Sequence, residues 1–402
     1  MYRGYLLNLN PPLGLLYLGT KMKEVSEVQI IDCEASQFTY DKIISYVHRF
    51  KPDLIGLTST SWSYYSVEKL VPILKKVFPK IKVVLGGPHV TVIGEEALKT
   101  GADLVVLGEG ENVADKLFTE TGIIQGTRVE DFNFQIDRSL LLPPYNRGYI
   151  GNAPRYGSPE TVVLWSRGCP HKCVFCCNPI FQGKRTIFRT KESIIEELET
   201  LKRDGIKGIF VYDDELVGMN KEQTNWLKDI LQEIIERKLI FDFKCQGRCN
   251  PRVIDEELLE LMKKAGFRCV MLGCESGSDK VLKAIRKGIT VQDIKDTVKM
   301  IHNAGIEVWA FFMVGNLEET KEDIELTKQL ILELKPYTNY FQVTCTTPWQ
   351  GSELYNIAKS KNWIEIEDLS KYDGATAVMH TDWMTKEEMQ IYREELLKYV
   401  SQ

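Results

Sequence analysis

Apolar and polar positions alternate along the first 120 residues in blocks that predict strands and helices in turn. Short apolar runs predict strands at Val28–Asp32, Leu54–Thr58, Val83–Gly87 and Asp103–Leu107. Apolar residues at helical spacing predict helices at Tyr40–Phe50, Ser66–Phe78 and Gly94–Thr100. Strands that are apolar on both faces are typical of a parallel sheet with helices on both sides. We therefore expect a doubly wound, Rossmann-like α/β domain over residues 1–123.

Residues 124–160 lack this periodicity and predict a linker, since they carry Pro143, Pro144, Gly148, Gly151 and Pro154. The alternation then resumes. It predicts strands at 161–166, 208–212, 241–246, 268–274, 307–313 and 339–345, with helices at about 190–204, 221–237, 254–266, 290–304 and 320–334. Six such units, without a seventh and eighth, predict a partial (β/α)6 barrel over residues 161–345. Residues 346–402 are expected to form a short C-terminal segment with a terminal helix, Lys386–Val400.

Composition and charge narrow the class of protein. The chain has 402 residues, and 51 Lys and Arg against 56 Asp and Glu give a formal charge of −5. This mild acidity argues against a nucleic-acid-binding surface. No apolar run reaches the roughly 18 residues that would span a bilayer. The first residues also lack the pattern of a cleaved signal. We expect a cytoplasmic protein without a membrane span.

The chain has ten cysteines. Cytoplasmic cysteines stay reduced, so clustered ones indicate metal binding or catalysis. Six are scattered, and we expect them to be small buried hydrophobes: Cys33, Cys245, Cys249, Cys269, Cys274 and Cys345. The other four lie together directly after the first barrel strand, in Cys169-Pro-His-Lys-Cys173-Val-Phe-Cys176-Cys177.

The spacing Cys-x-x-x-Cys-x-x-Cys lets Cys169, Cys173 and Cys176 wrap one compact cluster from a single loop. Thiolates suit both iron–sulfur clusters and zinc. A structural zinc site needs a fourth ligand, for which Cys177 and His171 are candidates. Adjacent side chains seldom point at one metal, however, and three ligands on a four-iron cluster leave one iron open for catalysis. The pattern favours a [4Fe–4S] cluster over structural zinc.

Small and turn-forming residues follow three of the predicted N-terminal strands. They are Ser59-Thr60-Ser61, Gly86-Gly87-Pro88-His89 and Gly108-Glu109-Gly110-Glu111. Ligands of open α/β sheets bind at the carboxyl ends of the strands, and glycine lets a large ligand approach the backbone. Each stretch alone is also what a tight turn requires. Three of them at equivalent positions predict a binding rim.

The cysteine loop at the first strand of a six-unit barrel resembles the radical S-adenosylmethionine (SAM) superfamily. There the open iron binds the amino and carboxylate groups of SAM, and one electron from the cluster releases a 5′-deoxyadenosyl radical. The resemblance implies that Gly315-Asn316-Leu317-Glu318-Glu319-Thr320 lies by the adenine, although Asn316-Leu317-Glu318 replaces the commoner apolar-Pro-Gly. It implies SAM contacts at Asp213, Asp214, Glu215, Arg248, Glu275, Ser276 and Lys287.

The N-terminal domain resembles the cobalamin-binding domain of the cobalamin-dependent radical SAM subfamily. The resemblance implies cobalamin contacts at Pro12, Leu13, Gly14, Ser59, Thr60, Ser61, Gly86, Gly87, His89, Gly108, Glu109, Gly110 and Glu111. The chain has no Asp-x-His-x-x-Gly motif, which excludes a histidine cobalt ligand from that motif, and we expect His89 to line the rim. Only Tyr5–Leu9 precedes the Pro-Pro-Leu-Gly segment, so the domain is abbreviated and a vestigial cobalamin site is the alternative.

The resemblance implies a methyltransferase that uses a [4Fe–4S] cluster, SAM and cobalamin to methylate an unactivated carbon. It also implies an external one-electron reductant of the ferredoxin or flavodoxin type. The substrate would be a peptide, a protein or a small molecule, and compact members of the subfamily include the glutamine C-methyltransferase of methyl-coenzyme M reductase. Substrate contacts are expected near the sixth strand end, at Tyr337, Tyr340, Gln342, Thr344, Thr346, Thr347 and Trp349.

Two other functions compete with this prediction. The first is a radical SAM enzyme of another reaction class, such as coupling or rearrangement, with a vestigial cobalamin domain. The second is a non-catalytic cobalamin or iron–sulfur sensor, which the set of SAM-facing motifs disfavours.

Overall fold

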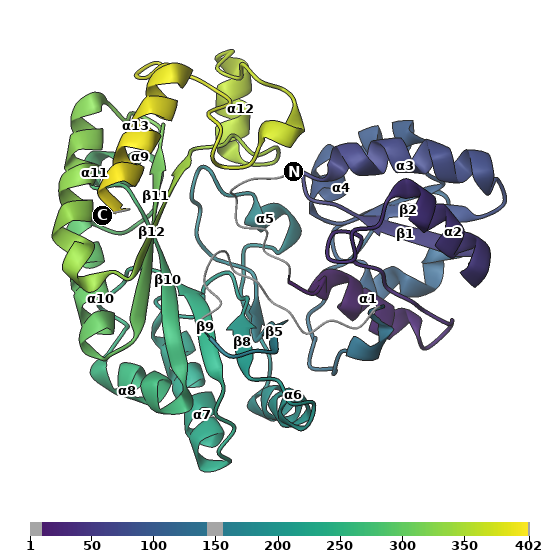
Figure 1. Cartoon of the computed structure of the whole chain (residues 1–402), viewed down its shortest axis with the longest axis horizontal. Coiled ribbons are helices and arrows are strands. Elements are labelled where there is room, and N and C mark those ends of the chain that lie inside the picture. Colours follow the sequence, from purple (N-terminus) through teal and green to yellow (C-terminus); the bar gives the residue numbers. More distant parts are fainter. Residues whose placement is uncertain (1–9, 143–155, 401–402) are drawn as a thin grey trace.

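The computed structural model describes residues 10–142 and 156–400, which form two α/β domains (Figure 1). The N-terminal domain is coloured purple to blue, and the second domain is coloured teal to yellow. The α/β class predicted from the sequence is confirmed. The linker residues Pro143, Pro144, Gly148, Gly151 and Pro154 lie outside the described residues, as does Tyr5–Leu9.

The N-terminal sheet is parallel and helices cover both of its faces. Its strands are β1 (Leu54–Thr58), β2 (Lys82–Gly86), β3 (Leu104–Leu107) and β4 (Gly122–Gln125), paired in that order. Val83 and Leu85 pack with α2 (Tyr40–Phe50), α3 (Tyr64–Val77), α4 (Pro88–Ile93) and the 3-10 helix η1 (Gly94–Thr100). Val84 and Val106 pack with α1 (Leu13–Met22) and the 3-10 helix η2 (Glu111–Leu117). This double covering explains why the strands read as apolar runs.

Several N-terminal predictions differ from the structure. Val28–Asp32 forms no strand, because Ile30 makes a single bridge to Leu141 and donates its N–H to the Leu140 carbonyl at 2.7 Å. Cys33, just beyond this segment, is exposed, so its prediction as a buried hydrophobe is wrong, whereas the other five scattered cysteines are buried. β4 occupies part of the predicted linker. Among the described residues the strand order also lacks the reversal that defines a doubly wound sheet.

The second domain contains a six-stranded parallel sheet in the order β12-β11-β10-β9-β8-β5. The strands are β5 (Glu160–Val163), β8 (Gly208–Val211), β9 (Asp242–Gly247), β10 (Phe267–Glu275), β11 (Glu307–Val314) and β12 (Tyr340–Cys345). β5 and β12 form the two edges of this sheet, so the barrel is open among the described residues. The predicted partial (β/α)6 barrel is confirmed.

The predicted helices cover the outside of this sheet. They are α6 (Lys191–Arg203), α7 (Lys221–Glu236), α8 (Glu256–Ala265), α10 (Val291–Asn303) and α11 (Lys321–Leu334). The first four begin at side chains that accept a backbone N–H, namely Thr190, Asn220, Asp255 and Thr290. The sequence does not predict α5 (Asn178–Phe181), α9 (Asp279–Ala284) or the antiparallel pair β6 (Ser166–Arg167) and β7 (Ile187–Phe188). Such short elements carry no readable periodicity.

A shared hydrophobic core joins the two domains. Leu13, Leu16 and Tyr17 of α1 lie in one cluster with side chains of the connecting segment and of the inner barrel face: Val129, Phe132, Leu140, Leu141, Val162, Phe210, Cys269, Met271 and Trp309. Helix α1 of the N-terminal domain therefore packs against the inner face of the open barrel. This contact fixes the two carboxyl edges relative to each other.

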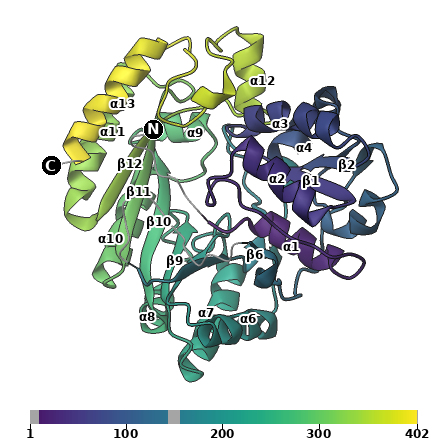
Figure 2. The same cartoon turned by 45° about the vertical axis from the view of Figure 1, so that its right-hand side comes forward.

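The C-terminal segment contacts the barrel and the cysteine loop. The predicted terminal helix α13 (Lys386–Val400) packs on β12 and α11, and an additional helix, α12 (Glu353–Ser360), precedes it. Leu354 and Trp363 pack against Val174, which lies between the cysteines. Figure 2 shows that this end of the chain also approaches the N-terminal domain, where the 3-10 helix η5 (Leu369–Lys371) lies against α3. Across residues 10–142 and 156–400, no helix is both long enough and apolar enough to cross a membrane.

Candidate functional site

The cysteine loop, residues 168–186, connects β6 to β7 beyond the carboxyl end of β5. Gly168 opens the loop with φ of +93°. A side chain at this position would lie 2.5 Å from the Arg185 carbonyl oxygen. The turn into the loop therefore requires glycine.

The loop carries the three thiols of the predicted spacing. Burial is the main cause that raises the thiol pKa of Cys169 and of Cys176 to about 12, and Cys173 is a smaller cause in the same direction. The three sulfur atoms are thus electrostatic neighbours. Burial and the Asp214 charge raise the pKa of Cys177 as well. A trio of thiols without a fourth protein thiol at the same spacing fits a [4Fe–4S] cluster with one open iron, and cluster binding would release the thiol protons.

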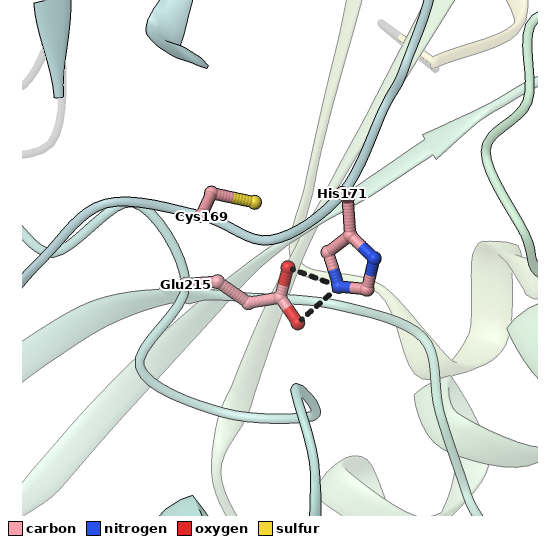
Figure 3. Close-up of side chains that lie close together, drawn as sticks. All are labelled: Cys169, His171 and Glu215. Carbon is pink, nitrogen blue, oxygen red and sulfur yellow. Dashed lines mark hydrogen bonds and ion pairs between the residues drawn. The ribbon is translucent and has the colours of Figure 1, made fainter. Parts of the chain in front are cut away.

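His171 and Glu215 lie beside Cys169 (Figure 3), and their potential ligand atoms are all within 4.8 Å of one another. His171 Nε2 lies 3.3 Å from the Glu215 carboxylate, and Arg248 Nη1 lies 3.9 Å from the same carboxylate. Glu215 therefore ties the cysteine loop to the end of β9. A metal held by this group would compete for Cys169 with the thiol trio.

The two aspartates after β8 support the loop in different ways. Asp213 is fully buried and accepts the Trp165 N–H at 2.8 Å and the Ser166 hydroxyl at 2.5 Å. Burial raises the pKa of Asp213 to about 7 and that of Asp214 to about 6. Asp214 accepts the N–H of Gly168 at 3.1 Å and the side-chain amide of Asn178 at 2.5 Å. Asp214 thus holds both ends of the cysteine-bearing segment, while its predicted SAM contact stays a prediction.

A buried ion pair lies at the carboxyl end of β10. Lys287 Nζ lies 2.7 Å from Glu275 Oε1, and both residues are buried. A side chain at Gly273 would meet both groups, since its Cβ would lie 2.5 Å from Glu275 Oε1 and 2.7 Å from Lys287 Nζ. Burial alone would lower the pKa of Lys287, but the Glu275 carboxylate and the nearby Cys173 outweigh it and raise the pKa. The pair therefore lies beside the thiol trio and offers opposite charges to a zwitterionic ligand such as SAM.

Two other predicted residues at this edge are used within the fold. Ser276 accepts the Ser278 N–H at 3.2 Å and lies 3.3 Å from the Thr327 hydroxyl. Asn316 donates to the Met313 carbonyl at 3.2 Å and accepts the Thr346 hydroxyl at 3.1 Å. These hydrogen bonds shape the strand ends.

The residues predicted to contact substrate divide between the barrel interior and the protein core. Tyr340, Gln342 and Thr344 alternate along β12, opposite Trp309, Phe311 and Met313 of β11. The other four make internal contacts: Thr346 donates to Asn316, Thr347 donates to the Cys345 carbonyl, Tyr337 packs on His302 and Trp349 packs on Tyr372. Of the seven predicted residues, Tyr340, Gln342 and Thr344 therefore lie on the inner face of the barrel.

The ends of β1 and β2 form a glycine-rich edge. Ser59 Oγ is buried without a hydrogen-bond partner. Gly87 has φ of +94°, and a side chain there would lie 2.1 Å from Thr58 Oγ1. Gly14 follows Pro12 and the buried Leu13 at the start of α1; it is exposed and has open space at its Cβ position. An unpaired buried hydroxyl at a bare backbone edge fits a large ligand such as cobalamin.

His89 is used inside the N-terminal domain. Its Nδ1 lies 2.9 Å from Ser61 Oγ, and its ring packs 4.4 Å from that of Tyr64. Burial lowers the His89 pKa to about 4, so the imidazole is neutral at physiological pH. The exposed Thr60 N–H is bound by the Ser63 hydroxyl at 3.2 Å.

Glu109 and Glu111 follow β3 and face the second domain. Arg167 Nη1 lies 2.9 Å from Glu111 Oε1 and 3.7 Å from Glu109 Oε1. Both carboxylates are therefore already paired, while their predicted cobalamin contacts stay a prediction. Arg167 was not among the residues predicted from the sequence. The available signal was a charged residue at the end of an apolar strand, directly before the cysteine loop.

Comparison with known proteins identifies the family of both domains. The family model described as the radical SAM superfamily matches residues 163–331, and the one described as the B12 binding domain matches residues 3–118. An uncharacterized methyltransferase of Pyrococcus horikoshii is 32% identical over 94% of this chain and 85% of its own. An anaerobic magnesium-protoporphyrin IX monomethyl ester cyclase of Rubrivivax gelatinosus is 28% identical over 94% of this chain and 71% of its own.

The fold is also that of a solved structure. The radical SAM methyltransferase TsrM of Kitasatospora setae, with cobalamin and a [4Fe–4S] cluster bound, superposes with a TM-score of 0.70 at 20% identity. The match covers 89% of this chain and 76% of that one. The cofactors of such enzymes are a [4Fe–4S] cluster, SAM and cobalamin. With a thiol trio on a radical SAM barrel, a B12-binding domain and a relative that spans both, the chain belongs to the cobalamin-dependent radical SAM methyltransferase family.

Proposed function

We propose that this chain transfers a methyl group from SAM to an unactivated carbon of a small molecule. One observation carries the proposal: the carboxyl edge of β3 pairs with the base of the cysteine loop, through Glu111 and Arg167 at 2.9 Å. The predicted cobalamin rim and the predicted cluster site thus meet at one junction. When bound, the cluster and SAM supply a 5′-deoxyadenosyl radical, and cobalamin supplies the methyl group.

The chain's own residues bind and orient these groups. Cys169, Cys173 and Cys176 hold the cluster, and Lys287 and Glu275 bind the carboxylate and amino group of SAM. This ion pair is buried beside Cys173, which keeps water away from the place where a carbon radical would form.

The inner barrel face supports an apolar or aromatic substrate. Tyr212 follows β8 at its carboxyl end and is 44% exposed, although it is a large aromatic residue. Tyr340 is 37% exposed but begins β12, at the amino edge of the sheet. Phe311 and Met313 lie on the same inner face. Open aromatic side chains with a few polar neighbours are typical of small-molecule sites. We therefore favour a small molecule over a protein substrate.

Product analysis tests the proposal. Anaerobically purified, cobalamin-loaded enzyme would be incubated with methyl-labelled SAM, a reductant and the separated small-molecule and protein fractions of a cell extract. We expect label in a small molecule, with one S-adenosylhomocysteine and one 5′-deoxyadenosine for each labelled product. Label in a protein would reject the substrate class. If 5′-deoxyadenosine forms with a converted substrate but without S-adenosylhomocysteine, methyl transfer itself is rejected.

A second candidate is a radical reaction without methyl transfer, as in coupling, rearrangement or ring closure. The identity of 28% with the Rubrivivax cyclase over 94% of this chain favours it. A cyclisation transfers no methyl group, so it would consume SAM only by cleavage. The same product analysis separates the two candidates.

The proposed reaction needs an electron from outside the chain. The described residues contain one cysteine trio with cluster spacing, so they provide no second cluster to relay electrons. We propose a one-electron donor of the ferredoxin or flavodoxin type. Such donors are cytoplasmic, and so would be this activity.

A further inference from the structure

Arg167 lies directly before the cysteine loop in the sequence, but its side chain pairs with carboxylates of the other domain. It is the last residue of β6, two positions before Cys169. Its side chain is 8% exposed, and its partners Glu111 and Glu109 are 7% and 13% exposed. The three charged groups are thus removed from water together, where an ion pair is screened far less than at the surface.

Two aromatic rings fix the guanidinium in place. The ring centroids of Tyr17 and Phe132 lie 4.3 Å and 4.7 Å from Arg167 Cζ. Tyr17 belongs to α1, and Phe132 belongs to the segment that connects the domains. Every side chain that holds Arg167 therefore comes from outside the barrel, while its backbone continues into the cysteine loop.

A second arginine, Arg128 of the connecting segment, forms hydrogen bonds to the backbone at the base of the same loop. Its guanidinium donates to the carbonyls of Arg167, at 3.4 Å, and of Arg185. It fits because side chains at Gly168 and Gly183 would lie 2.8 Å and 1.6 Å from its nitrogen atoms. The base of the loop is thus held from the N-terminal side at several points, and Arg167 is the point that reaches β3.

We propose that Arg167 is a positioning residue that couples the cluster site to the cobalamin rim, so that each cofactor strengthens the binding of the other. A cluster on Cys169 fixes the backbone two residues from Arg167. Arg167 then holds Glu109 and Glu111, and with them the Gly108–Glu111 turn at the rim. Because coupling between two binding sites is reciprocal, bound cobalamin raises the affinity for the cluster by the same factor. The inference requires only the family's cofactors and holds for either reaction class.

The experiment measures cobalamin affinity by absorbance titration, with and without the reconstituted cluster. The wild-type chain should bind cobalamin at least fivefold more tightly when the cluster is present, at the lower end of typical coupling. Arg167→Met should reduce this ratio to about one. Arg167→Lys, which keeps the charge but loses the planar guanidinium, should restore part of it.

A matched control removes a different arginine of the same loop. Arg185 pairs with Glu130, and both side chains are largely exposed, at 69% and 60%. Arg185→Met should keep the wild-type ratio. For each variant, we would record the iron content of the reconstituted protein and the unfolding temperature of the cluster-free protein. A purely structural role of the arginine would lower both quantities without changing the affinity ratio.

Two results would overturn the proposal. One is equal cobalamin affinity of wild-type protein with and without the cluster. The other is an unchanged ratio in Arg167→Met. Should that variant fail to fold, Glu111→Gln takes its place, since it removes the charge of the partner and leaves Arg167 present. An unchanged ratio in Glu111→Gln would count equally against the coupling.

Discussion

Lys287 and Glu275 form a buried ion pair, with Lys287 Nζ 2.7 Å from Glu275 Oε1. Each charge thus has a partner within the protein. SAM carries both an amino and a carboxylate group, so it offers each residue an opposite charge of its own. In the proposed binding mode, SAM would replace this one internal contact with two contacts of its own.

Lys287→Met and Glu275→Gln should each weaken SAM binding. A hydrogen bond to a charged group is worth about 1.5–3 kcal/mol, which corresponds to roughly ten- to a hundredfold in affinity. Lys287→Met should also destabilise the protein, since it leaves the Glu275 carboxylate buried and unpaired. Calorimetric titration of the cluster-loaded protein with SAM measures the first effect. Cobalamin loading should not change, and a parallel loss of cobalamin would indicate general unfolding instead.

Replacing Cys169, Cys173 or Cys176 by alanine should abolish cluster binding. Each removes one of three thiolate ligands, whereas Cys177→Ala removes a thiol outside the spacing. Iron content and the broad visible absorption of the reconstituted protein measure the outcome. Loss of iron in Cys177→Ala would show that the ligand assignment is wrong.

Asp214→Asn should weaken cluster retention while leaving the fold intact. The carboxylate accepts hydrogen bonds from Gly168 and Asn178 at the two ends of the cysteine segment, and an amide replaces one acceptor oxygen with a donor. We expect iron to be lost several-fold faster to a chelator. Asp229→Asn, an exposed change on α7, is the control. Equal rates in the two variants would contradict the positioning role.

The buried His89 should make stability depend on pH in the acidic range. Its pKa is lowered by burial from 6.5 to about 4, so the unfolded chain binds a proton that the folded chain does not. The contribution is complete above pH 6.5 and is lost as the pH falls toward 4. It amounts to at most about 3 kcal/mol.

Denaturant unfolding at pH 4.5 and pH 7, on wild type and on His89→Gln, measures this dependence. The difference in unfolding free energy between the two pH values should shrink in the variant. An unchanged difference would mean that His89 is not the titrating group.

In cobalamin-loaded protein, His89→Ala should also leave the electron paramagnetic resonance spectrum of cob(II)alamin without a change in nitrogen splitting.

Local pattern and motif spacing predicted most of the architecture. The helix Tyr40–Phe50 and the strand Leu54–Thr58 have the bounds read from their periodicity, because apolar residues recur along each at the spacing of its own structure. The resemblance to radical SAM motifs singled out Glu275 and Lys287, and the structure brings their side chains together. The spacing of the cysteines likewise located their loop at the first barrel strand.

Contacts between distant segments escaped prediction. Ile30 pairs with Leu141 rather than with the sheet, and nothing in its own apolar run distinguishes the two outcomes. Nothing in the sequence around Glu109 and Glu111 indicated that both carboxylates pair with the guanidinium of Arg167. Such pairings depend on how the domains dock, which no periodicity encodes.

The contact between Val174 and Leu354 sets an order of assembly during synthesis. Leu354 donates its N–H to the Val174 carbonyl at 2.9 Å, and both side chains lie in one core with Trp363. All six barrel strands leave the ribosome before this partner does. The nascent chain thus displays its cysteines on a loop that lacks this contact until the later residues emerge. We expect iron–sulfur delivery to be most effective after residues 354–363 have left the ribosome.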